Sequence, residues 1–533
     1  MPKISGGEAI VAALEANGAK AVFGIPGVHN LSIYDALIDS SLEHYVTRHE
    51  QGAGFMADGY ARATGKPGVC LPITGPGITN MSTAIAQAFS DSSPLVVISS
   101  QIDANLCDQR KGTLHELKDQ LALTGQLTEW NARALTPKQC ADEVFKAYAW
   151  LAVRRGRPVH IEIPLDVLAA KDDVSLPASD APLYPPLRPD EEEIEKAAAL
   201  IARSRTPVIY AGGGALASGA GDALLRLSDA LGAPIILTCQ GKGAVPEDHP
   251  AVLGNNLQDP LVQKFLEKCD LTVAIGTHFG AHNTSNWKTR LPGPIIHMDV
   301  DRDEFQRNYP AAATVWSDAK LGIEALLQAL PGHGTSGLLD EVPRVKAQVC
   351  ESFAKGNAWE VEYTGIIRNA LGRDGILVCD MTALCYPATR CYPVYEPHTF
   401  MFPRGLGTLG FALPAAMGAR VGRKDRKVVA IAGDGGFMFT CQELAIAAQY
   451  NLGVVLVLVN SSSYHVVKRN QIRVFGEKRT IDVDLKNPDF GKMADSFGVW
   501  YRRAPNAQDF QRGLDEALKH DGPAMIEIPF GSA

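Results

Sequence analysis

The chain has 533 residues, of which 46% are hydrophobic and 21% charged, and its formal net charge is −8. Its length suffices for about three domains, and its composition is that of an ordinary globular protein. The net negative charge argues against nucleic acid as a partner. No apolar run reaches the roughly 18 residues that span a bilayer, and the N-terminus lacks a signal-peptide core.

Ten cysteines are scattered along the chain, and none belongs to a Cys-x-x-Cys pair. Such spacing favours reduced thiols over a disulfide framework or a zinc site. We therefore predict a cytoplasmic protein that has neither a membrane nor a nucleic acid as its partner.

Two segments, residues 171–193 and 331–342, are rich in Pro or Gly and are typical of linkers. They predict three domains, which we place at residues 1–172, 190–332 and 345–533. Each block alternates apolar runs with helical stretches, a pattern that indicates a parallel sheet covered by helices. The predicted fold class is α/β, with three doubly wound domains built on mainly parallel sheets.

The apolar runs are the expected strands. In chain order they begin at Ala21, Gly68, Pro94 and Pro158 in the first block, at Pro207, Ala233, Leu271 and Pro294 in the middle block, and at Gly375, Lys427, Gly453 and Ala524 in the last. The first and last blocks both close on Glu-Ile-Pro, which hints at an old duplication.

Three residues of the first block are candidates for chemistry. Glu50 follows a short strand and opens a helix of small residues, which would let another backbone or a ligand come close. His29 lies in the loop after the first strand, and His115 lies in a loop of mixed charge. Each also has an ordinary explanation: a Glu that favours the helix dipole, a structural His, and a surface loop.

The last block carries the most informative motif. An apolar run stops at Gly433-Asp434-Gly435, and a second apolar run ends at Asn460. These are the carboxyl ends of two strands in a β-α-β unit, where open α/β sheets bind ligands. A carboxylate and further oxygen donors suit Mg²⁺, and the glycines let backbone N–H groups approach a diphosphate. An ordinary capped turn would explain the motif alone.

Together these motifs resemble a known family. Gly433-Asp434-Gly435 followed by Asn460 is similar to the thiamine diphosphate fingerprint, while residues 48–53, 57–62 and 74–80 resemble the N-terminal domain of the acetolactate synthase and 2-oxoacid decarboxylase superfamily. The similarity covers essentially the whole chain. It implies a pyrimidine-binding domain, a central Rossmann-like domain and a diphosphate-binding domain, in that order.

The resemblance implies a role for each candidate. Glu50 is expected to hydrogen-bond the ring nitrogen of the aminopyrimidine, and the cofactor would act as electron sink when CO₂ leaves a 2-oxo acid. His29 is expected to relay protons, and His115 or Glu116 to contact the substrate. The expected cofactor-binding residues are Thr382, Gly407, Leu409, Gly433, Asp434, Gly435, Gly436 and Ser463.

The metal site departs from the family pattern. Relatives usually end the motif in Asn-Asn, but here Asn460 is followed by Ser461. A hydroxyl is a shorter and weaker donor than an amide carbonyl. The expected Mg²⁺ ligands are Asp434, Asn460, Ser461 and Ser463, with either Asn460 or Ser461 left open as an individual ligand.

The branch of the family is suggested by the first block, in which residues 23–29, 48–60 and 158–167 are similar to the 5-guanidino-2-oxopentanoate (2-ketoarginine) decarboxylase branch. Glu116 or Asp119 could then pair with a guanidinium. The expected function is non-oxidative decarboxylation of a small 2-oxo acid. The alternative is a carboligase or lyase, either acetolactate synthase-like or benzaldehyde lyase-like.

Two further alternatives stay open. One is a non-catalytic scaffold, which Ser461 favours and Glu50 opposes. The other is an FAD-containing oxidase, for which residues 212–214, three consecutive glycines, are a weak nucleotide signal. The family also implies that the cofactor lies between two subunits, so the expected partner is a second copy in a homodimer or homotetramer.

Overall fold

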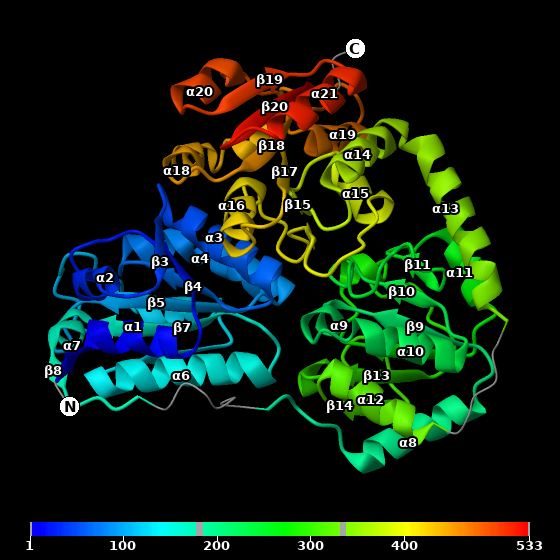
Figure 1. The fold of residues 1–533 in the computed structure, drawn as a ribbon, viewed down its shortest axis with the longest axis horizontal. Coiled ribbons are helices and arrows are strands. Elements are labelled where there is room, and N and C mark those ends of the chain that lie inside the picture. The colour runs from blue at the N-terminus through cyan, green and yellow to red at the C-terminus, as the bar shows by residue number, and fades with distance from the viewer. Residues whose placement is uncertain (1–2, 177–184, 331–336, 531–533) are drawn as a thin grey trace.

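The computed structural model describes residues 3–176, 185–330 and 337–530. Three six-stranded parallel sheets with flanking helices form three lobes (Figure 1). This architecture confirms the predicted fold class. The domain boundaries stay predictions, because parts of both proposed linkers fall outside the described residues.

The N-terminal sheet has the strand order β3-β2-β4-β5-β7-β6. Its strands are β2 (Ala21–Gly24), β3 (Glu43–Val46), β4 (Gly68–Leu71), β5 (Leu95–Gln101), β6 (Trp130–Arg133) and β7 (Val159–Pro164). The helices are α1 (Gly6–Ala16), α2 (Leu31–Ile38), α3 (Glu50–Thr64), α4 (Pro76–Asp91), α5 (Gln120–Thr124), α6 (Pro137–Val153) and α7 (Leu165–Ala169). A short antiparallel pair joins β1 (Ile4–Ser5) to β8 (Lys171–Asp172).

The central sheet has the order β11-β10-β9-β12-β13-β14. Relative to chain order this is 3-2-1-4-5-6, the Rossmann arrangement. Its strands are β9 (Pro207–Ala211), β10 (Ile235–Leu237), β11 (Val252–Gly254), β12 (Leu271–Ile275), β13 (Ile295–Asp299) and β14 (Ala313–Trp316). The helices are α8 (Glu191–Arg203), α9 (Gly213–Ala217), α10 (Gly221–Leu231), α11 (Pro260–Leu266) and α12 (Ala319–Ala329), and α13 (Val342–Gly356) leads out of the lobe.

The C-terminal sheet has the order β16-β15-β17-β18-β20-β19. Its strands are β15 (Ile376–Cys379), β16 (Phe400–Met401), β17 (Val428–Gly433), β18 (Val454–Asn460), β19 (Trp500–Arg503) and β20 (Ala524–Pro529). The helices are α14 (Ala358–Leu371), α15 (Cys385–Cys391), α16 (Ala412–Gly422), α17 (Asp434–Phe437), α18 (Leu444–Gln449), α19 (His465–Phe475), α20 (Phe490–Ser496) and α21 (Ala507–Ala517).

The N-terminal and C-terminal sheets share one topology. The short strands β1 and β8 form a separate pair. When the strands of each six-stranded sheet are numbered in chain order, both sheets have the order 2-1-3-4-6-5. The two Glu-Ile-Pro endings belong to β7 and β20, which hold the same place in the two sheets. The shared strand order is what a duplication would leave behind.

Strand burial explains why the apolar runs form these sheets. Six consecutive residues of β18, Val454 to Val459, are buried. A strand that is covered on both faces needs such a continuous apolar run, because each side chain meets a helix or another lobe. The polar residue comes only at the end, at Asn460.

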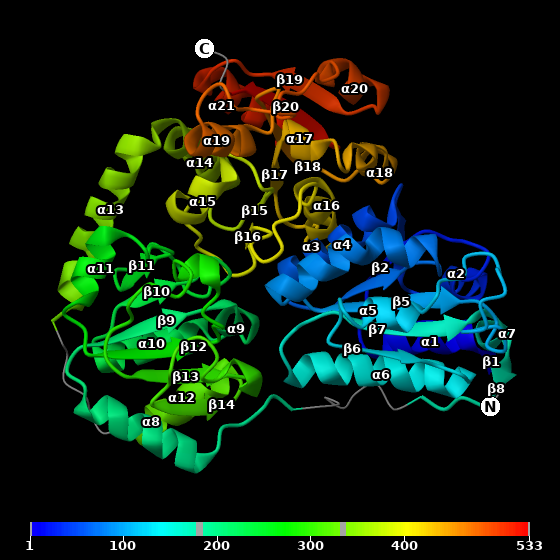
Figure 2. The same ribbon diagram turned by 180° about the vertical axis from the view of Figure 1, so that it is seen from behind.

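Helices α3 and α16 join the N-terminal lobe to the C-terminal lobe at backbone distance (Figures 1 and 2). A Cβ placed on Gly59 would lie 1.9 Å from the Ala415 carbonyl oxygen, and one on Gly418 would lie 1.8 Å from that of Met56. Only glycine allows such an approach. Side chains from both helices belong to one hydrophobic core that the two lobes share.

A half-buried arginine, Arg155, links the N-terminal lobe to the central lobe, where its partner Glu304 is buried. Arg155 donates to Glu304 Oε1 at 2.6 Å and to Ser92 Oγ at 2.7 Å, and its Nη2 lies 3.1 Å from His278 Nδ1. Taking these charges out of water is costly, so removing one partner would leave the other uncompensated. The three lobes are therefore fixed to one another by specific contacts.

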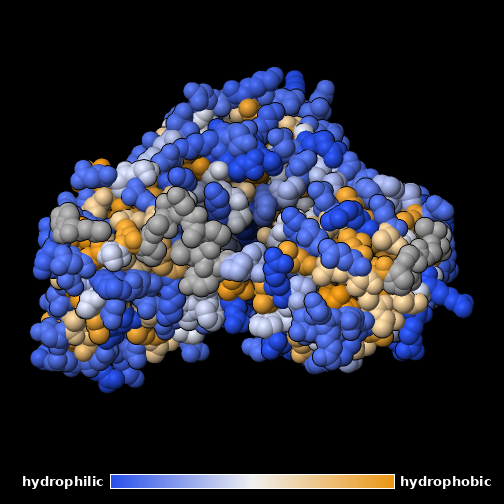
Figure 3. Space-filling view, turned by 60° about the horizontal axis from the view of Figure 1, so that its bottom comes forward, coloured by the Kyte–Doolittle hydropathy of each residue, from blue (hydrophilic) through white to orange (hydrophobic). Residues whose placement is uncertain are grey.

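The molecular surface seen in Figure 3 is mostly hydrophilic, with scattered hydrophobic residues. None of the helices in the described ranges has both the length and the hydropathy of a transmembrane span.

The contact between α3 and α16 can be tested with Gly59→Ala. The added methyl group has no room beside Ala415, so we expect the free energy of unfolding to fall by roughly 1–3 kcal/mol, the usual cost of overpacking. Chemical denaturation of the purified protein measures it.

Gly365→Ala is the matched control, because Gly365 lies within α14 and has open space around its Cβ position. We expect this change to be neutral or to stabilise the protein by up to about 1 kcal/mol. Equal effects of the two substitutions would contradict the close crossing of α3 and α16.

Candidate active site

Three neighbouring strands of the C-terminal sheet end at one edge. Cys379 of β15 pairs with Ile431 of β17, and Gly433 of β17 pairs with Val459 of β18. The residues that follow are polar, so Asp380, Asp434 and Asn460 collect at the carboxyl edge. This is the edge that the sequence predicted for a ligand.

Asp434 is 2% exposed, and other polar groups of the edge satisfy its carboxylate. Ser461 Oγ donates to Asp434 Oδ1 at 3.3 Å and lies 3.0 Å from the carbonyl oxygen of Ser463. Asn487 Nδ2 donates to Asp434 Oδ2 at 2.7 Å and to Asn460 Oδ1 at 3.0 Å. The structure thus brings together all four residues predicted as metal ligands and adds Asn487 to them.

The glycines of the motif let neighbouring side chains approach the backbone closely. A Cβ on Gly433 would lie 2.8 Å from Thr382 Oγ1, one on Gly435 would lie 2.6 Å from the Tyr464 ring, and one on Gly436 would lie 3.6 Å from Leu409 Cδ2. The first N–H groups of α17 have no intrahelical partner. Packing against Thr382 and Tyr464 therefore accounts for Gly433 and Gly435, and the N–H groups at the start of α17 are the donors that suit a diphosphate.

The loop with Gly407 and Leu409 is held by a buried acid. Asp380 Oδ2 accepts a hydrogen bond from the Gly410 N–H at 3.0 Å, and burial raises the pKa of Asp380 to about 6 against the backbone donors that lower it. Gly407 has a φ of 76°, a backbone conformation that favours glycine. Leu409 is only partly buried although apolar. It therefore offers an apolar surface beside α17.

The N-terminal lobe holds the second group. Glu50 begins α3, as predicted, and is 8% exposed. Asn80, from α4, donates to Glu50 Oε2 at 2.9 Å. The carboxylate is thus oriented by a side chain of the neighbouring helix.

His29 and His115 lie together, although their loops are far apart in sequence. Their rings stack with centroids 5.1 Å apart, and the Nδ1 atom of each is buried without a hydrogen-bond partner. Burial lowers the pKa of His29, and the nearby His115 lowers it further. His29 is therefore neutral near pH 7 and is able to accept a proton.

Glu116 turns back onto its own loop. Its Oε2 accepts the N–H groups of Gly112 at 2.7 Å and Thr113 at 2.9 Å, and the bond from Thr113 is the main reason for its lowered pKa. Its Oε1 is buried and has no partner. Asp119 instead caps α5 by accepting from the Ala122 N–H at 2.9 Å. Glu116 therefore keeps a buried oxygen without a partner, whereas the exposed Asp119 carboxylate uses Oδ1 as a helix cap.

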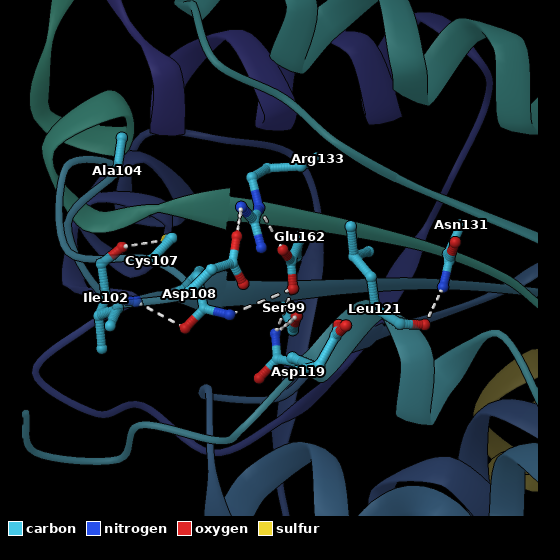
Figure 4. A network of polar contacts seen from close by, with 12 residues as sticks. Ser99, Ile102, Ala104, Cys107, Asp108, Asp119, Leu121, Asn131, Arg133 and Glu162 are labelled. Atoms are coloured by element: carbon cyan, nitrogen blue, oxygen red, sulfur yellow. Dashed lines mark hydrogen bonds and ion pairs between the residues drawn. The ribbon is translucent and has the colours of Figure 1, made fainter. Parts of the chain in front are cut away.

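A buried polar network around Gln120 joins the segment before α4 to strands β5 and β7. Gln120 is 1% exposed; it donates to Ser99 Oγ and to Glu162 Oε2, both at 3.0 Å, and it accepts from Thr74 Oγ1 at 2.9 Å. Figure 4 shows Arg133 between Glu162 and Asp108 in this network. Thr74 stands two residues before α4, so the network holds the segment that leads into that helix.

Helix α4 also contacts the C-terminal lobe. Gln87 accepts from the Thr408 N–H at 3.2 Å, and Asp91 accepts from the Gly405 N–H at 2.7 Å. The first turns of α4 thus hold Glu50 through Asn80, and its last turns hold the loop of Gly407 and Leu409.

Within the described part of one chain, no hydrogen bond joins Glu50 to Asp434, Ser461 or Asn487. Glu443 adds a polar contact to the packing of α3 on α16: it is fully buried and accepts the Arg48 N–H at 3.2 Å. Burial raises the pKa of Glu443 to about 7, against the lowering by the N–H groups of Arg48 and His49. The two groups of candidate residues are fixed in one chain without direct contact.

The glycine run of the central lobe packs against protein. A Cβ on Gly212 would lie 2.2 Å from the Gly276 carbonyl oxygen, and one on Gly214 would lie 2.7 Å from Gly276 Cα. These glycines are explained by the close approach of the turn after β12, so they give no independent support to a nucleotide site.

Sequence reasoning missed four residues of this arrangement: Asn80, Gln120, Glu443 and Asn487. Asn80 stands in a motif that was recognised, but its contact with Glu50 depends on how two helices pack. Asn487 precedes a proline, which is only a turn signal. Its approach to Asp434 could not be read from a separation of 53 residues.

Family models match all three lobes. The N-terminal TPP binding domain of thiamine pyrophosphate enzymes matches residues 4–123, their central domain matches 194–329, and their C-terminal TPP binding domain matches 380–528. The order of domains is the one that the resemblance implied.

Curated relatives are similar along their whole length. A probable 2-ketoarginine decarboxylase of Pseudomonas aeruginosa is 39% identical, with 98% of this chain and 94% of that protein covered. A probable acetolactate synthase large subunit of Methanocaldococcus jannaschii is 35% identical, with 98% and 92% covered. The acetolactate synthase isozyme 2 large subunit of Escherichia coli is 31% identical, with 98% and 95% covered.

Glu443 makes a testable contribution to pH dependence. Its pKa rises from 4.5 to about 7 on folding, so the folded protein binds this proton more tightly than the unfolded chain. The free energy of unfolding should therefore fall by up to about 1.4 kcal/mol per pH unit between pH 5 and 7. Glu443→Gln should remove this slope, as measured by denaturation at several pH values.

Asp425→Asn is the control, because the pKa of this exposed carboxylate is about 2 and lies below the window. It should change stability equally at every pH from 5 to 7. An unchanged slope in Glu443→Gln would contradict the raised pKa of Glu443.

Proposed function

Because this chain belongs to the thiamine pyrophosphate enzyme family, we propose that it uses thiamine diphosphate and Mg²⁺ to decarboxylate a 2-oxo acid without oxidation. The main support is the oxygen cluster of Asp434, Ser461 and Ser463 at one sheet edge, together with Glu50 at the edge of another. When bound, thiamine diphosphate supplies a carbon nucleophile and an electron sink for the carbanion that CO₂ loss leaves.

The C-terminal lobe would hold the diphosphate and the metal. Asp434, the Ser461 hydroxyl and the Ser463 carbonyl offer hard oxygen ligands, and Asn460 offers an amide oxygen. Among the described residues, no three His, Cys, Asp or Glu side chains gather as a metal site. A site with one carboxylate suits an ion that completes its coordination with phosphate oxygens. Gly435 and Gly436 would donate N–H groups to the diphosphate.

Leu409 and Gly407 would support the rings of the cofactor. The apolar side chain of Leu409 lies beside Gly436. Asp380 holds the next residue of the loop, Gly410, by accepting its N–H. Leu409 would thereby set the angle between two rings, while the Gly407 carbonyl would accept from a ring amine.

Glu50 would hold the proton of the aminopyrimidine ring. Asn80 orients its carboxylate, and the carboxylate would face the ring nitrogen. Moving that proton is general acid–base work, which typically contributes 10²- to 10⁴-fold to a rate. His29 and His115 would exchange protons with the substrate, because their buried Nδ1 atoms have no partner in the protein.

The proposed assembly is a homodimer or homotetramer with active sites between subunits. Its support is that Glu50 and Asp434 make no contact in one chain, so each group would be completed by a second copy. All ten cysteines are free thiols, which supports the proposed cytoplasmic location.

The proposed substrate is 5-guanidino-2-oxopentanoate, in keeping with the Pseudomonas relative. The free oxygen of Glu116 would face the guanidinium, since a carboxylate pairs with it through charge-assisted hydrogen bonds. The acetolactate synthase relatives support the alternative, a carboligase that joins a second carbonyl compound. Product analysis with pyruvate, alone and with an aldehyde, distinguishes the two.

The proposed reaction is tested by CO₂ release from a panel of 2-oxo acids. We expect activity only with thiamine diphosphate and Mg²⁺ present, and a loss on treatment with a chelator. Glu50→Gln should lower kcat by about 10²- to 10⁴-fold, while a fluorescence titration still detects cofactor binding.

Glu43→Gln is the control, because this carboxylate lies on the same strand–helix unit but pairs with Lys424 at 2.7 Å. It should leave kcat unchanged. Full activity of Glu50→Gln, or activity without cofactor, would refute the proposed role of Glu50.

The substrate assignment is tested at Glu116. Glu116→Ala should raise KM for 5-guanidino-2-oxopentanoate by about tenfold or more, since a charge-assisted hydrogen bond contributes roughly 1.5–3 kcal/mol, and should raise KM for pyruvate far less. Steady-state kinetics with both substrates measures it.

Glu116→Gln separates charge from loop structure, because its amide oxygen can still accept from Gly112 and Thr113. We expect it to resemble Glu116→Ala with the guanidino substrate. An equal rise in KM for both substrates would rule out the pairing.

A further inference from the structure

Asn487 bridges two residues of the proposed metal site, Asp434 and Asn460. Its Nδ2 donates to Asp434 Oδ2 at 2.7 Å and to Asn460 Oδ1 at 3.0 Å. Two oxygens from different strands therefore converge on one amide nitrogen. On the other side, the Ser461 hydroxyl lies within hydrogen-bond distance of Asp434 and the Ser463 carbonyl. The N–H groups of Asn487 and the hydroxyl of Ser461 thus bring together oxygens of Asp434, Asn460 and Ser463.

The backbone around Asn487 is fixed to the same turn. The Tyr464 N–H donates to the Val483 carbonyl and the Leu485 N–H to the Ser462 carbonyl, both at 2.8 Å. Ser463 and Asp484 form an antiparallel bridge. Residues 483–487 therefore form a strap across the turn that follows β18.

The far side of Asn487 is also restrained. Pro488 limits the backbone of the residue before it to extended conformations. Asp489 then caps α20 by accepting from the Lys492 N–H at 3.1 Å. The strap and the helix thus keep the Asn487 side chain beside Asp434, so a change of ligand there requires only a turn of the terminal amide.

A carboxamide has two faces of equal size and opposite chemistry. Half a turn about the last side-chain bond exchanges Nδ2, a donor, for Oδ1, an acceptor. With Oδ1 turned inward, the same side chain becomes an oxygen ligand. The site needs such a ligand, because Ser461 supplies only a hydroxyl where an amide oxygen is usual.

We infer that Asn487 is a further ligand of the metal. Its amide N–H groups hold Asp434 and Asn460 together, and its Oδ1, turned inward, would supply the amide oxygen that Ser461 lacks. The inference rests on the proposed Mg²⁺ site and goes beyond it, since the strap would belong to the coordination sphere.

Metal affinity tests the inference directly, without turnover. The full-length protein is saturated with thiamine diphosphate and titrated with Mn²⁺, and free Mn²⁺ is followed by electron paramagnetic resonance. Asn487→Ala should weaken Mn²⁺ binding by about tenfold or more. Asn487→Asp should bind Mn²⁺ at least as tightly as the unmodified protein, because it keeps an oxygen in place.

Thermal unfolding gives a second readout. Asn487→Asp places a carboxylate against Asp434, and like charges destabilise each other without a cation. The rise in Tm that Mn²⁺ produces should therefore be larger in Asn487→Asp than in the unmodified protein. If Asn487→Ala does not fold, this variant still decides the question.

Lys468→Ala is the matched control for the strap. It removes the ion pair of Lys468 with Asp484, 2.5 Å long, but leaves the amide in place. We expect nearly unchanged Mn²⁺ affinity. A loss equal to that of Asn487→Ala would mean that the strap matters only through its order, and it would overturn the inference.

The remaining outcomes separate the inference from the proposed function. Unchanged or tighter Mn²⁺ binding by Asn487→Ala, with normal binding by the unmodified protein, overturns the role of Asn487 alone. Absence of Mn²⁺ binding by the unmodified protein in the presence of thiamine diphosphate overturns the metal site and the inference together.

Discussion

The backbone contact between α3 and α16 is the constraint on which the site depends. Gly59 and Gly418 allow two helices of different lobes to touch without intervening side chains. Since α3 begins at Glu50 and α16 follows the loop of Leu409, this crossing fixes the position of Glu50 relative to that loop within one chain. Buried groups such as Glu443 then complete a fit that the glycines make possible.

The elements were largely predictable, because each depends on local pattern. Continuous apolar runs became buried parallel strands, and Glu50 began its helix where the small residues start. The order of the strands was not predictable in this way, since it depends on which runs pair. Family resemblance supplied the domain order, and the three matched models confirm it.

Site residues that belong to one sequence motif were predictable. Site residues whose position depends on tertiary packing were not. Asp434 and Ser461 follow adjacent strands, so their approach follows from parallel pairing. Asn487 comes from a strap whose register is set by backbone hydrogen bonds, and Asn80 depends on the angle between helices. Glu116 shows a third case: nothing in its spacing indicates that one of its oxygens would cap its own loop.

Helix α4 contacts both groups of candidate residues. From Asn80 to Asp91 it runs about 16 Å at 1.5 Å per residue. Asn80 holds Glu50, and Asp91 holds the loop that carries Gly407 and Leu409. In a pair of copies, Glu50 would serve one reaction centre while the loop of Gly407 serves the other. Helix α4 would then join two reaction centres through one rigid element, so a shift at Asn80 would also displace the contacts of Asp91.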